Sequence, residues 1–129
     1  MEISKLPLLL HALLETAASL SFTLNPTAQL PGADSETRLV LRNYGSLLFS
    51  SSILCFSFYF RPGFDSATAT VAGSMAIYHI APVARAYIRI AEGRRQQNKV
   101  LGGSVVHLFV HLVAFGGLAW SAVYGRDGL

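Results

Sequence analysis

Four long apolar stretches dominate the sequence, and each is long enough to cross a lipid bilayer as an α-helix. The hydrocarbon core of a bilayer is about 30 Å thick, and about 20 helical residues span it. The stretches predict helices over residues 6–24, 38–60, 66–90 and 100–124, joined by short connections into one transmembrane domain over residues 1–129. The sequence therefore predicts an all-α fold, an integral membrane four-helix bundle.

Composition supports a membrane location. Hydrophobic residues make up 52% of the chain and charged residues 13%, which leaves too little polar surface to cover a water-soluble globule. Basic residues exceed acidic ones by 10 to 7, but no long basic run occurs, so we expect no nucleic acid partner. The single cysteine, Cys55, excludes an intramolecular disulfide. The expected partners are the bilayer and a lipophilic small molecule, with homo- or hetero-oligomerisation left open.

Local signals predict where the helices begin and which of them bend or pack closely. Asp34 or Ser35 can cap the second helix, and Asp65 or Ser66 the third. Pro82 predicts a kink in the third helix. The fourth apolar stretch is rich in small residues that let neighbouring helices approach; these are Gly102, Gly103, Gly116, Gly117 and Ser121.

The distribution of basic residues predicts the orientation in the membrane. The start of the chain is similar to a secretory signal, but Glu15 interrupts its apolar run, so we expect a retained first helix. The side holding the first and third loops carries most of the basic residues, namely Arg38, Arg89, Arg94, Arg95 and Lys99, with Arg42 and Arg85 leaning towards it. The opposite side carries Lys5, Arg61 and Arg126. Both termini are therefore expected to be non-cytoplasmic, in the lumen of the endoplasmic reticulum of a eukaryotic cell.

Five ionisable side chains lie at membrane depth, where each costs a few kcal/mol or more. Glu15, His79 and His111 fall near the middle of their helices, and His11 and His107 lie about one turn away. His11 and Glu15 are four residues apart, so they share one helix face. The same spacing places His107 and His111 on one face of their helix. These five residues are the candidate catalytic groups.

A second set of polar residues predicts a binding pocket between the helices. Tyr78 and Arg85 belong to a helical stripe on the third helix. The second helix carries Arg42 and a polar face made of Asn43, Ser46, Ser50 and Ser57. The long side chains of Arg42 and Arg85 can also extend to the membrane surface. Together, Tyr78, Asn43, Arg42 and Arg85 are the candidate residues for binding an amphipathic or lipophilic small molecule.

A carboxyl group and imidazoles in one apolar pocket favour acid–base chemistry. We expect proton transfer to or from a lipophilic substrate, as in an isomerisation, cyclisation or epoxide opening, with Glu15 as the leading acid or base. One alternative is a non-catalytic accessory or lipid-binding subunit whose polar core only holds the helices together. A small proton-coupled transporter is a third class, but a chain of this length would have to oligomerise to build a transport pathway.

Metal binding is a second chemical hypothesis. A His-x3-Glu pair on one helix and a His-x3-His pair on another could supply ligands to a Zn or Fe ion, with His79 as an extra ligand. The sequence lacks the spacing of a known metal motif such as His-Glu-x2-His. From the sequence we therefore expect no metal and no cofactor.

The hydropathy layout carries a resemblance to a known class of membrane protein. The four apolar stretches resemble the layout of small four-helix membrane proteins of the DoxX-like type, and the segments Arg42-Asn43-Tyr44-Gly45 and Tyr78-His79-Ile80-Ala81-Pro82 are similar to segments of proteins from filamentous fungi. The resemblance implies a left-handed four-helix bundle and assigns no site residue. Small fungal membrane enzymes of similar size act in the maturation of terpenoids or polyketides, so this analogy adds those two substrate classes to the expectation.

Overall fold

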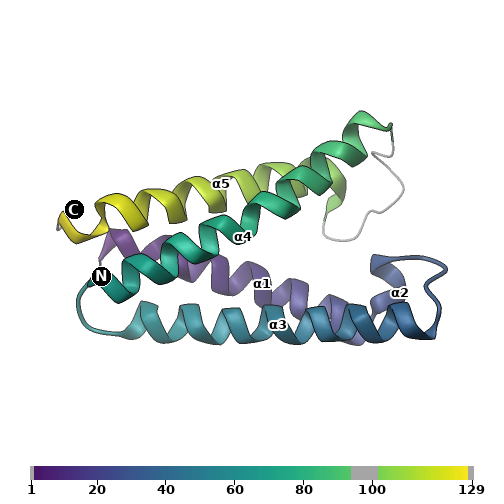
Figure 1. Ribbon diagram of the computed structural model, residues 1–129, viewed down its shortest axis with the longest axis horizontal. Helices are drawn as coiled ribbons and strands as arrows, with labels where there is room; N and C mark the ends of the chain where they lie inside the picture. Colours follow the sequence, from purple (N-terminus) through teal and green to yellow (C-terminus); the bar gives the residue numbers. More distant parts are fainter. Residues whose placement is uncertain (1, 94–101, 128–129) are drawn as a thin grey trace.

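The computed structural model describes residues 2–93 and 102–127, and the described residues form helices, turns and loops without a strand (Figure 1). The helices, in chain order, are α1 (Leu6–Leu24), α2 (Pro26–Gln29), α3 (Ser35–Phe60), α4 (Ser66–Ala91) and α5 (Gly103–Tyr124). Short 3-10 turns, Ile3–Lys5 and Gly125–Asp127, precede α1 and follow α5. The predicted all-α class is confirmed for the described part of the chain.

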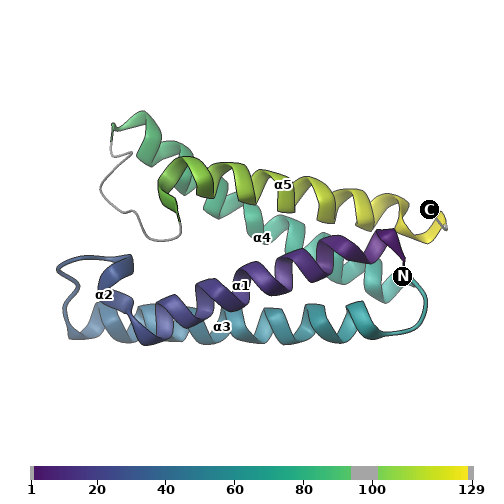
Figure 2. The ribbon, with the colours of Figure 1, turned by 180° about the vertical axis from the view of Figure 1, so that it is seen from behind.

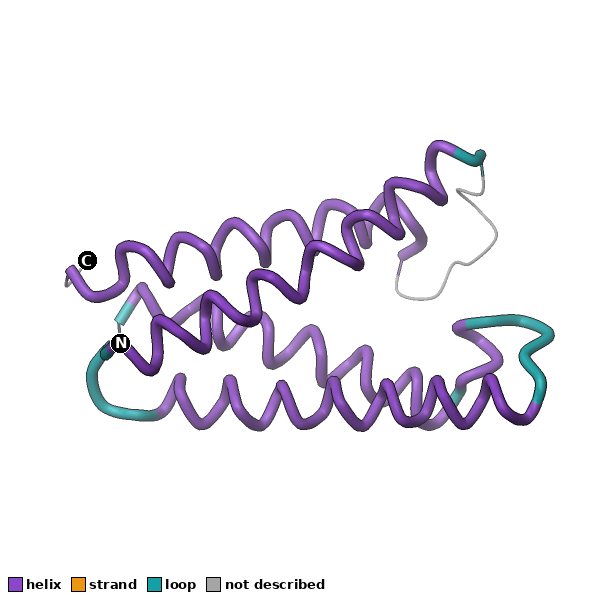
Figure 3. The backbone as a smooth tube through the Cα atoms, viewed as in Figure 1, coloured by secondary structure: helices purple, strands orange, loops and turns teal. Residues whose placement is uncertain are grey.

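The four long helices lie alongside one another as two pairs. Helix α1 packs mainly along α3, and α4 packs mainly along α5. Contacts between the pairs are fewer, and most of them join α1 to α5. Both chain ends lie at one end of the molecule, and the pairs separate towards the other end, which holds α2 (Figures 1 and 2). The loop with α2 lies at that end, as do the last turn of α4 and the first turn of α5 (Figure 3).

Acidic caps fix the starts of two long helices. The Asp34 carboxylate accepts a hydrogen bond of 2.8 Å from the backbone N–H of Thr37, so α3 begins three residues before the predicted start at residue 38. Asp65 accepts one of 2.9 Å from Thr68 in the same way at the start of α4. Both carboxylates satisfy a backbone donor that the first turn of a helix leaves free. The predicted Asp caps are confirmed.

The remaining boundaries differ in detail from the prediction. Helix α1 has the predicted bounds, and α4 runs without a break through Pro82. Helix α5 begins at Gly103 rather than at residue 100, after Gly102 with a φ of 92° that favours glycine. The short α2 was not predicted; it begins at Pro26, a residue preset for a first helical position. Most of the polar loop predicted over residues 92–98 lies outside the described residues.

Several ionisable side chains are buried while many large apolar side chains are exposed. His11 and His79 are 0% exposed and Glu15 is 1% exposed, whereas Ile77 and Phe109 are each 69% exposed. Large exposed apolar side chains occur along all four long helices. Apolar surface on this scale is found where a protein contacts lipid or a partner.

Three of the four predicted membrane crossings have the length and hydropathy of a membrane span. These are Ile3–Leu24, Ser35–Phe60 and Gly103–Tyr124. Helix α4 is as long as α3, but its residues are not apolar enough on average for it to count as a fourth candidate span. Its shortfall has a local cause, because Tyr78, His79 and Arg85 interrupt its apolar residues.

Candidate functional site

A cavity of about 220 Å³ lies between the two helix pairs, towards the end that holds α2. Its apolar lining consists of leucine, alanine, phenylalanine and valine side chains from α1, α3 and α5. Its polar lining comes from all five helices and consists of Glu15, Gln29, Tyr44, Tyr78, Arg85, His107 and His111. A mostly apolar cavity with a few convergent polar groups is the usual form of a small-molecule site.

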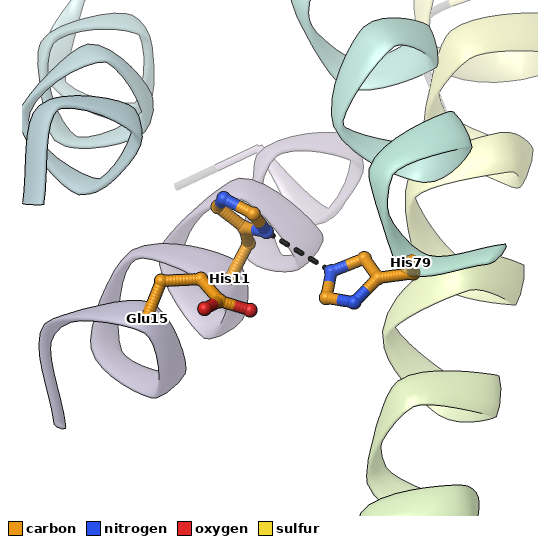
Figure 4. A group of neighbouring side chains, drawn as sticks. All are labelled: His11, Glu15 and His79. Atoms are coloured by element: carbon orange, nitrogen blue, oxygen red, sulfur yellow. Dashed lines mark hydrogen bonds between the residues drawn. The ribbon is translucent and has the colours of Figure 1, made fainter. Parts of the chain in front are cut away.

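Helix α1 supplies the two central side chains of the site. His11 and Glu15 are one turn apart and both are buried, so they share the inward face of α1. Figure 4 shows them beside His79, which reaches the same place from α4. His79 is also fully buried.

Three imidazoles form a continuous hydrogen-bonded chain across α1, α4 and α5. His11 Nδ1 lies 3.0 Å from His79 Nε2, and His79 Nδ1 lies 2.7 Å from His111 Nδ1. At the other end of the chain, His11 Nε2 lies 3.4 Å from the Ser51 Oγ on α3. The chain therefore connects all four long helices.

The donors and acceptors along the three-histidine chain can be assigned by starting from Ser51. Ser51 donates its hydroxyl proton to the Leu48 carbonyl oxygen at 2.8 Å, so its Oγ accepts from His11 Nε2–H. A neutral His11 then accepts at Nδ1 from His79 Nε2–H, and a neutral His79 accepts at Nδ1 from His111 Nδ1–H. His111 is left with Nε2 as its acceptor nitrogen, and His111 lines the cavity.

Glu15 belongs to a second hydrogen-bonded group. The Tyr78 hydroxyl donates to Glu15 Oε2 at 3.2 Å, and Tyr44 Oη lies 2.9 Å from Tyr78 Oη. The other carboxyl oxygen, Glu15 Oε1, is buried and has no hydrogen-bond partner among the residues that the structure describes. An unpaired buried polar atom is unusual in a protein and calls for an explanation.

The two groups meet at one point. One nitrogen from each of His11 and His79 and one carboxylate oxygen of Glu15 all lie within 4.8 Å of one another. Among the described residues, these three form the one group of histidine, cysteine or acidic side chains placed to hold a metal ion. The arrangement brings acid–base groups, or the ligands of a metal, together at the wall of an apolar cavity.

The predicted site residues fall into three groups. Glu15, His11, His79 and His111 come together, as the hydrogen bonds above show. The cavity wall also includes His107, Tyr78 and Arg85; the His107 ring centroid is 6.2 Å from that of His111. Arg42 and Asn43 are exposed on α3 and do not line the cavity.

The polar face predicted for the second helix lies on the outside of the molecule. Ser46, Ser50 and Ser57 are exposed on α3, and each donates its hydroxyl proton to the backbone carbonyl oxygen four residues earlier. A serine that bonds to its own helix in this way gives no signal of facing a pocket. The expected pocket lining from this face is therefore absent.

Gln29 on α2 was not predicted as a residue of the site, and neither were two residues of α3, Tyr44 and Ser51. Tyr44 and Ser51 are seven residues apart, about two turns of α3, and Tyr44 precedes Gly45. Gly45 is buried, and a side chain added there would overlap Thr23 Oγ1 and lie 3.1 Å from the Ser19 carbonyl oxygen on α1. The small residue Gly45 thus marks the inward face of α3 and was the available signal.

Comparisons with protein-family models, with curated proteins and with solved structures found no match. The resemblance to the DoxX-like layout therefore stays a prediction. The function has to be argued from the geometry of the site.

Proposed function

We propose that this chain is an integral membrane acid–base enzyme. In this proposal α1, α3, α4 and α5 all cross the bilayer, and a lipophilic small molecule enters the cavity between the two helix pairs. Glu15 and its neighbouring histidines transfer a proton to or from that molecule in an isomerisation, cyclisation or epoxide opening. Terpenoids and polyketides are the proposed substrate classes.

The buried ionisable side chains and the exposed apolar side chains support the membrane location. Apolar residues cover the outer faces of the long helices, and hydroxyls on those faces bond within their own helices, as Thr70 does to Ser66 and Ser74 to Thr70. Both features suit a surface that contacts lipid, where every polar group has to be satisfied internally. Helix α4 can cross despite its lower hydropathy because His79 and Pro82 are buried among the other helices.

Glu15 Oε1 is the single observation that carries the enzymatic proposal. Leaving a buried acceptor unpaired costs about 1–3 kcal/mol. This oxygen belongs to a side chain on the cavity wall, so a substrate in the cavity could take the place of the missing partner. A carboxyl group that exchanges a proton with a substrate needs such a free oxygen.

The neighbouring side chains suit the transfer of a proton. Tyr78 holds the second carboxyl oxygen, which fixes the orientation of Glu15 without occupying Oε1. The three-histidine chain ends at His111 on the cavity wall, so a second group able to accept a proton borders the same space. An isomerisation needs two such positions, one that removes a proton and one that returns it.

A non-catalytic accessory or lipid-binding subunit is the second candidate. The observation in its favour is that the imidazole chain ties α1, α4 and α5 to α3, which is what a purely structural polar core would do. This alternative gives no role to the unpaired oxygen of Glu15.

Replacement of Glu15 by glutamine separates the two candidates. Glu15→Gln keeps the shape and the acceptor for Tyr78 but cannot transfer a proton. In a cell that accumulates an unprocessed lipophilic intermediate when the gene is deleted, we expect the variant to lower turnover by about two to four powers of ten. The matched control is Glu36→Gln, which changes an exposed carboxyl group in the first turn of α3.

The proposal fails if stably folded Glu15→Gln protein restores full turnover. The accessory role would then become the first candidate. We expect a smaller loss of the same kind for His11→Gln, since His11 lies one turn from the carboxyl group and can orient or charge it.

A further inference from the structure

We infer that His11, His79 and Glu15 form a binding site for a divalent transition metal ion of the zinc class. The binding itself does not depend on the proposed function. With the ion bound, Glu15 would be a metal ligand, and a water on the ion would take over the proton transfer that the proposed function gives to the free carboxyl group. The inference begins from three buried ligand atoms on two helices, all within 4.8 Å of one another.

The two histidine nitrogens are already close to the separation that a metal requires. Two Zn–N bonds of about 2.0–2.1 Å at a tetrahedral angle place the nitrogens about 3.3 Å apart. His11 Nδ1 and His79 Nε2 are 3.0 Å apart, so a bound ion would widen this contact by a few tenths of an ångström (Figure 4). The carboxylate of Glu15 has to move further, and its flexible side chain allows that.

The ring nitrogens that would not bind the metal already have partners. His11 Nε2 lies 3.4 Å from Ser51 Oγ, and His79 Nδ1 lies 2.7 Å from His111 Nδ1. Histidine ligands generally donate the opposite ring N–H to such a partner, which fixes the tautomer and the orientation of the ring. Ser51 and His111 are therefore placed as supporting residues of the metal site.

The protons balance when the ion binds. His11 keeps its proton on Nε2 and needs no change. His79 frees Nε2 by carrying its proton on Nδ1, where it donates to His111 Nδ1, and His111 then carries its own proton on Nε2. Each imidazole still holds one proton after the ion has bound. Binding of the ion therefore releases a proton only if Glu15 was protonated beforehand.

Glu15 Oε1 supplies an independent argument. Within the described part of the chain it is a buried oxygen without a hydrogen-bond partner, on a side chain that is 1% exposed, whereas Oε2 is held by Tyr78. An ion bound to Oε1 would satisfy the atom without breaking the contact to Tyr78. The bound cation would also compensate the negative charge of a buried carboxylate.

The donor set identifies the class of ion. Two imidazole nitrogens and one carboxylate oxygen suit Zn²⁺, Co²⁺ or Fe²⁺, whereas Mg²⁺ prefers oxygen ligands and retains water. Three protein ligands leave a fourth position, and the cavity beside Glu15 has room for it. A zinc-class ion with an open position acidifies a bound water, which could then serve as the proton donor or acceptor.

A zinc titration of the whole protein tests the inference. The protein is purified in detergent with a tag that contains no histidine, stripped with a chelator, and titrated with Zn²⁺ in competition with a chromogenic chelator. We expect one equivalent to bind, and an excess of Mg²⁺ not to displace it. His79→Ala and Glu15→Gln should each weaken binding by more than about 100-fold, and His111→Ala by about 10–100-fold.

His107→Ala is the matched control, because His107 lines the same cavity but is not one of the three ligands. Its affinity for Zn²⁺ should equal that of the unchanged protein. The inference is overturned if the folded, unchanged protein takes up no stoichiometric Zn²⁺, if His107→Ala loses as much affinity as His79→Ala, or if Mg²⁺ competes. Thermal unfolding checks the fold of each variant, and His79→Gln replaces His79→Ala if the latter does not fold.

The outcome is separable from that of the proposed function. A protein that binds no zinc but loses turnover in Glu15→Gln is an acid–base enzyme without a metal. A protein that binds zinc through these ligands but keeps full turnover in Glu15→Gln has the metal site without the proposed catalysis.

Discussion

At the residue scale, polar contacts join two helices, a role that apolar packing has elsewhere in the molecule. Helices α1 and α4 approach each other at few positions, yet they share the hydrogen bonds from His11 to His79 and from Tyr78 to Glu15. These bonds lie in the buried interior, where a polar group without a partner is expensive. The side chains of the site therefore also supply the polar contact between α1 and α4.

A single carboxylate outside the proposed spans gives a pH-dependent prediction. The backbone N–H and the hydroxyl of Thr68 both donate to Asp65, and these hydrogen bonds lower the pKa of its carboxyl group below the usual value of 3.8. Because the folded-state pKa is the lower one, the stabilisation is present above pH 4 and is lost as the pH falls through the folded-state value. The thermal midpoint in detergent should fall over that acidic range.

Asp65→Asn is the control for this titration, because asparagine also caps helices but carries no titrating group. The variant should lose the part of the acid-dependent decrease that belongs to Asp65. An unchanged pH profile in Asp65→Asn would show that the ionisation of Asp65 does not contribute to the acid-dependent loss of stability.

The sequence predicted part of the site for a clear physical reason. Glu15 and the histidines are expensive at membrane depth, and their spacing of four residues placed each pair on one helix face. The partners across helices could not be predicted, because spacing along one helix does not reveal which residue of another helix lies opposite. For this reason the contact between His11 and His79, and the metal site proposed from it, could be recognised only in the structure. For the same reason Arg42 and Asn43 were predicted to line the pocket, whereas they are exposed on α3.

At the element scale, α3 shows how a helix can be predicted correctly and its inward face missed. Its last residue and its Asp34 cap agree with the structure, although the helix begins three residues before the predicted start. Its exposed serines suggested a polar face, but their hydroxyls bond to the helix itself. The inward face is identified by the close contact at Gly45.

Gly45 also gives a prediction about helix packing. Gly45→Ala places a methyl group 3.1 Å from the Ser19 carbonyl oxygen, a backbone atom of α1 that cannot rotate away. We expect the substitution to separate α1 from α3 and lower the free energy of unfolding by about 1–3 kcal/mol. Gly116→Ala is the control, because no atom lies within 4 Å of the added carbon and alanine favours a helix.

The free energy of unfolding of both glycine variants is measured in a denaturing detergent. Gly116→Ala should be neutral or slightly stabilising. Equal stability of the two variants would contradict the close approach of α1 and α3 at Gly45.

At the scale of the whole molecule, the position of the chain ends leads to a topology prediction. Both ends lie at the same end of the molecule, which agrees with the four crossings that we propose (Figure 1). Since basic residues gather around the first and third loops, tags at both termini should be protected from protease added to the cytoplasmic side of sealed membranes. Digestion of both terminal tags, with survival of tags in the two loops, would show the reverse orientation.

The overall arrangement was predictable only in part. The four long helices follow from the length of the apolar stretches, and their starts follow from caps such as Asp65. The pairing of α1 with α3 and of α4 with α5 depends on contacts between distant segments, such as Gly45 against Thr23 and Gly73 against Ala122. No local pattern in the sequence specifies those contacts.

The central claim is that the buried Glu15 is retained for function rather than for stability. The free energy of unfolding of Glu15→Met, measured in detergent against the unchanged protein, tests it without any knowledge of the substrate. Methionine fills a similar volume and removes the unpaired Oε1, which offsets the loss of the hydrogen bond from Tyr78. We predict a change of about 1 kcal/mol or less, or a gain in stability, whereas a loss of about 3 kcal/mol or more would contradict the account and make Glu15 a structural residue.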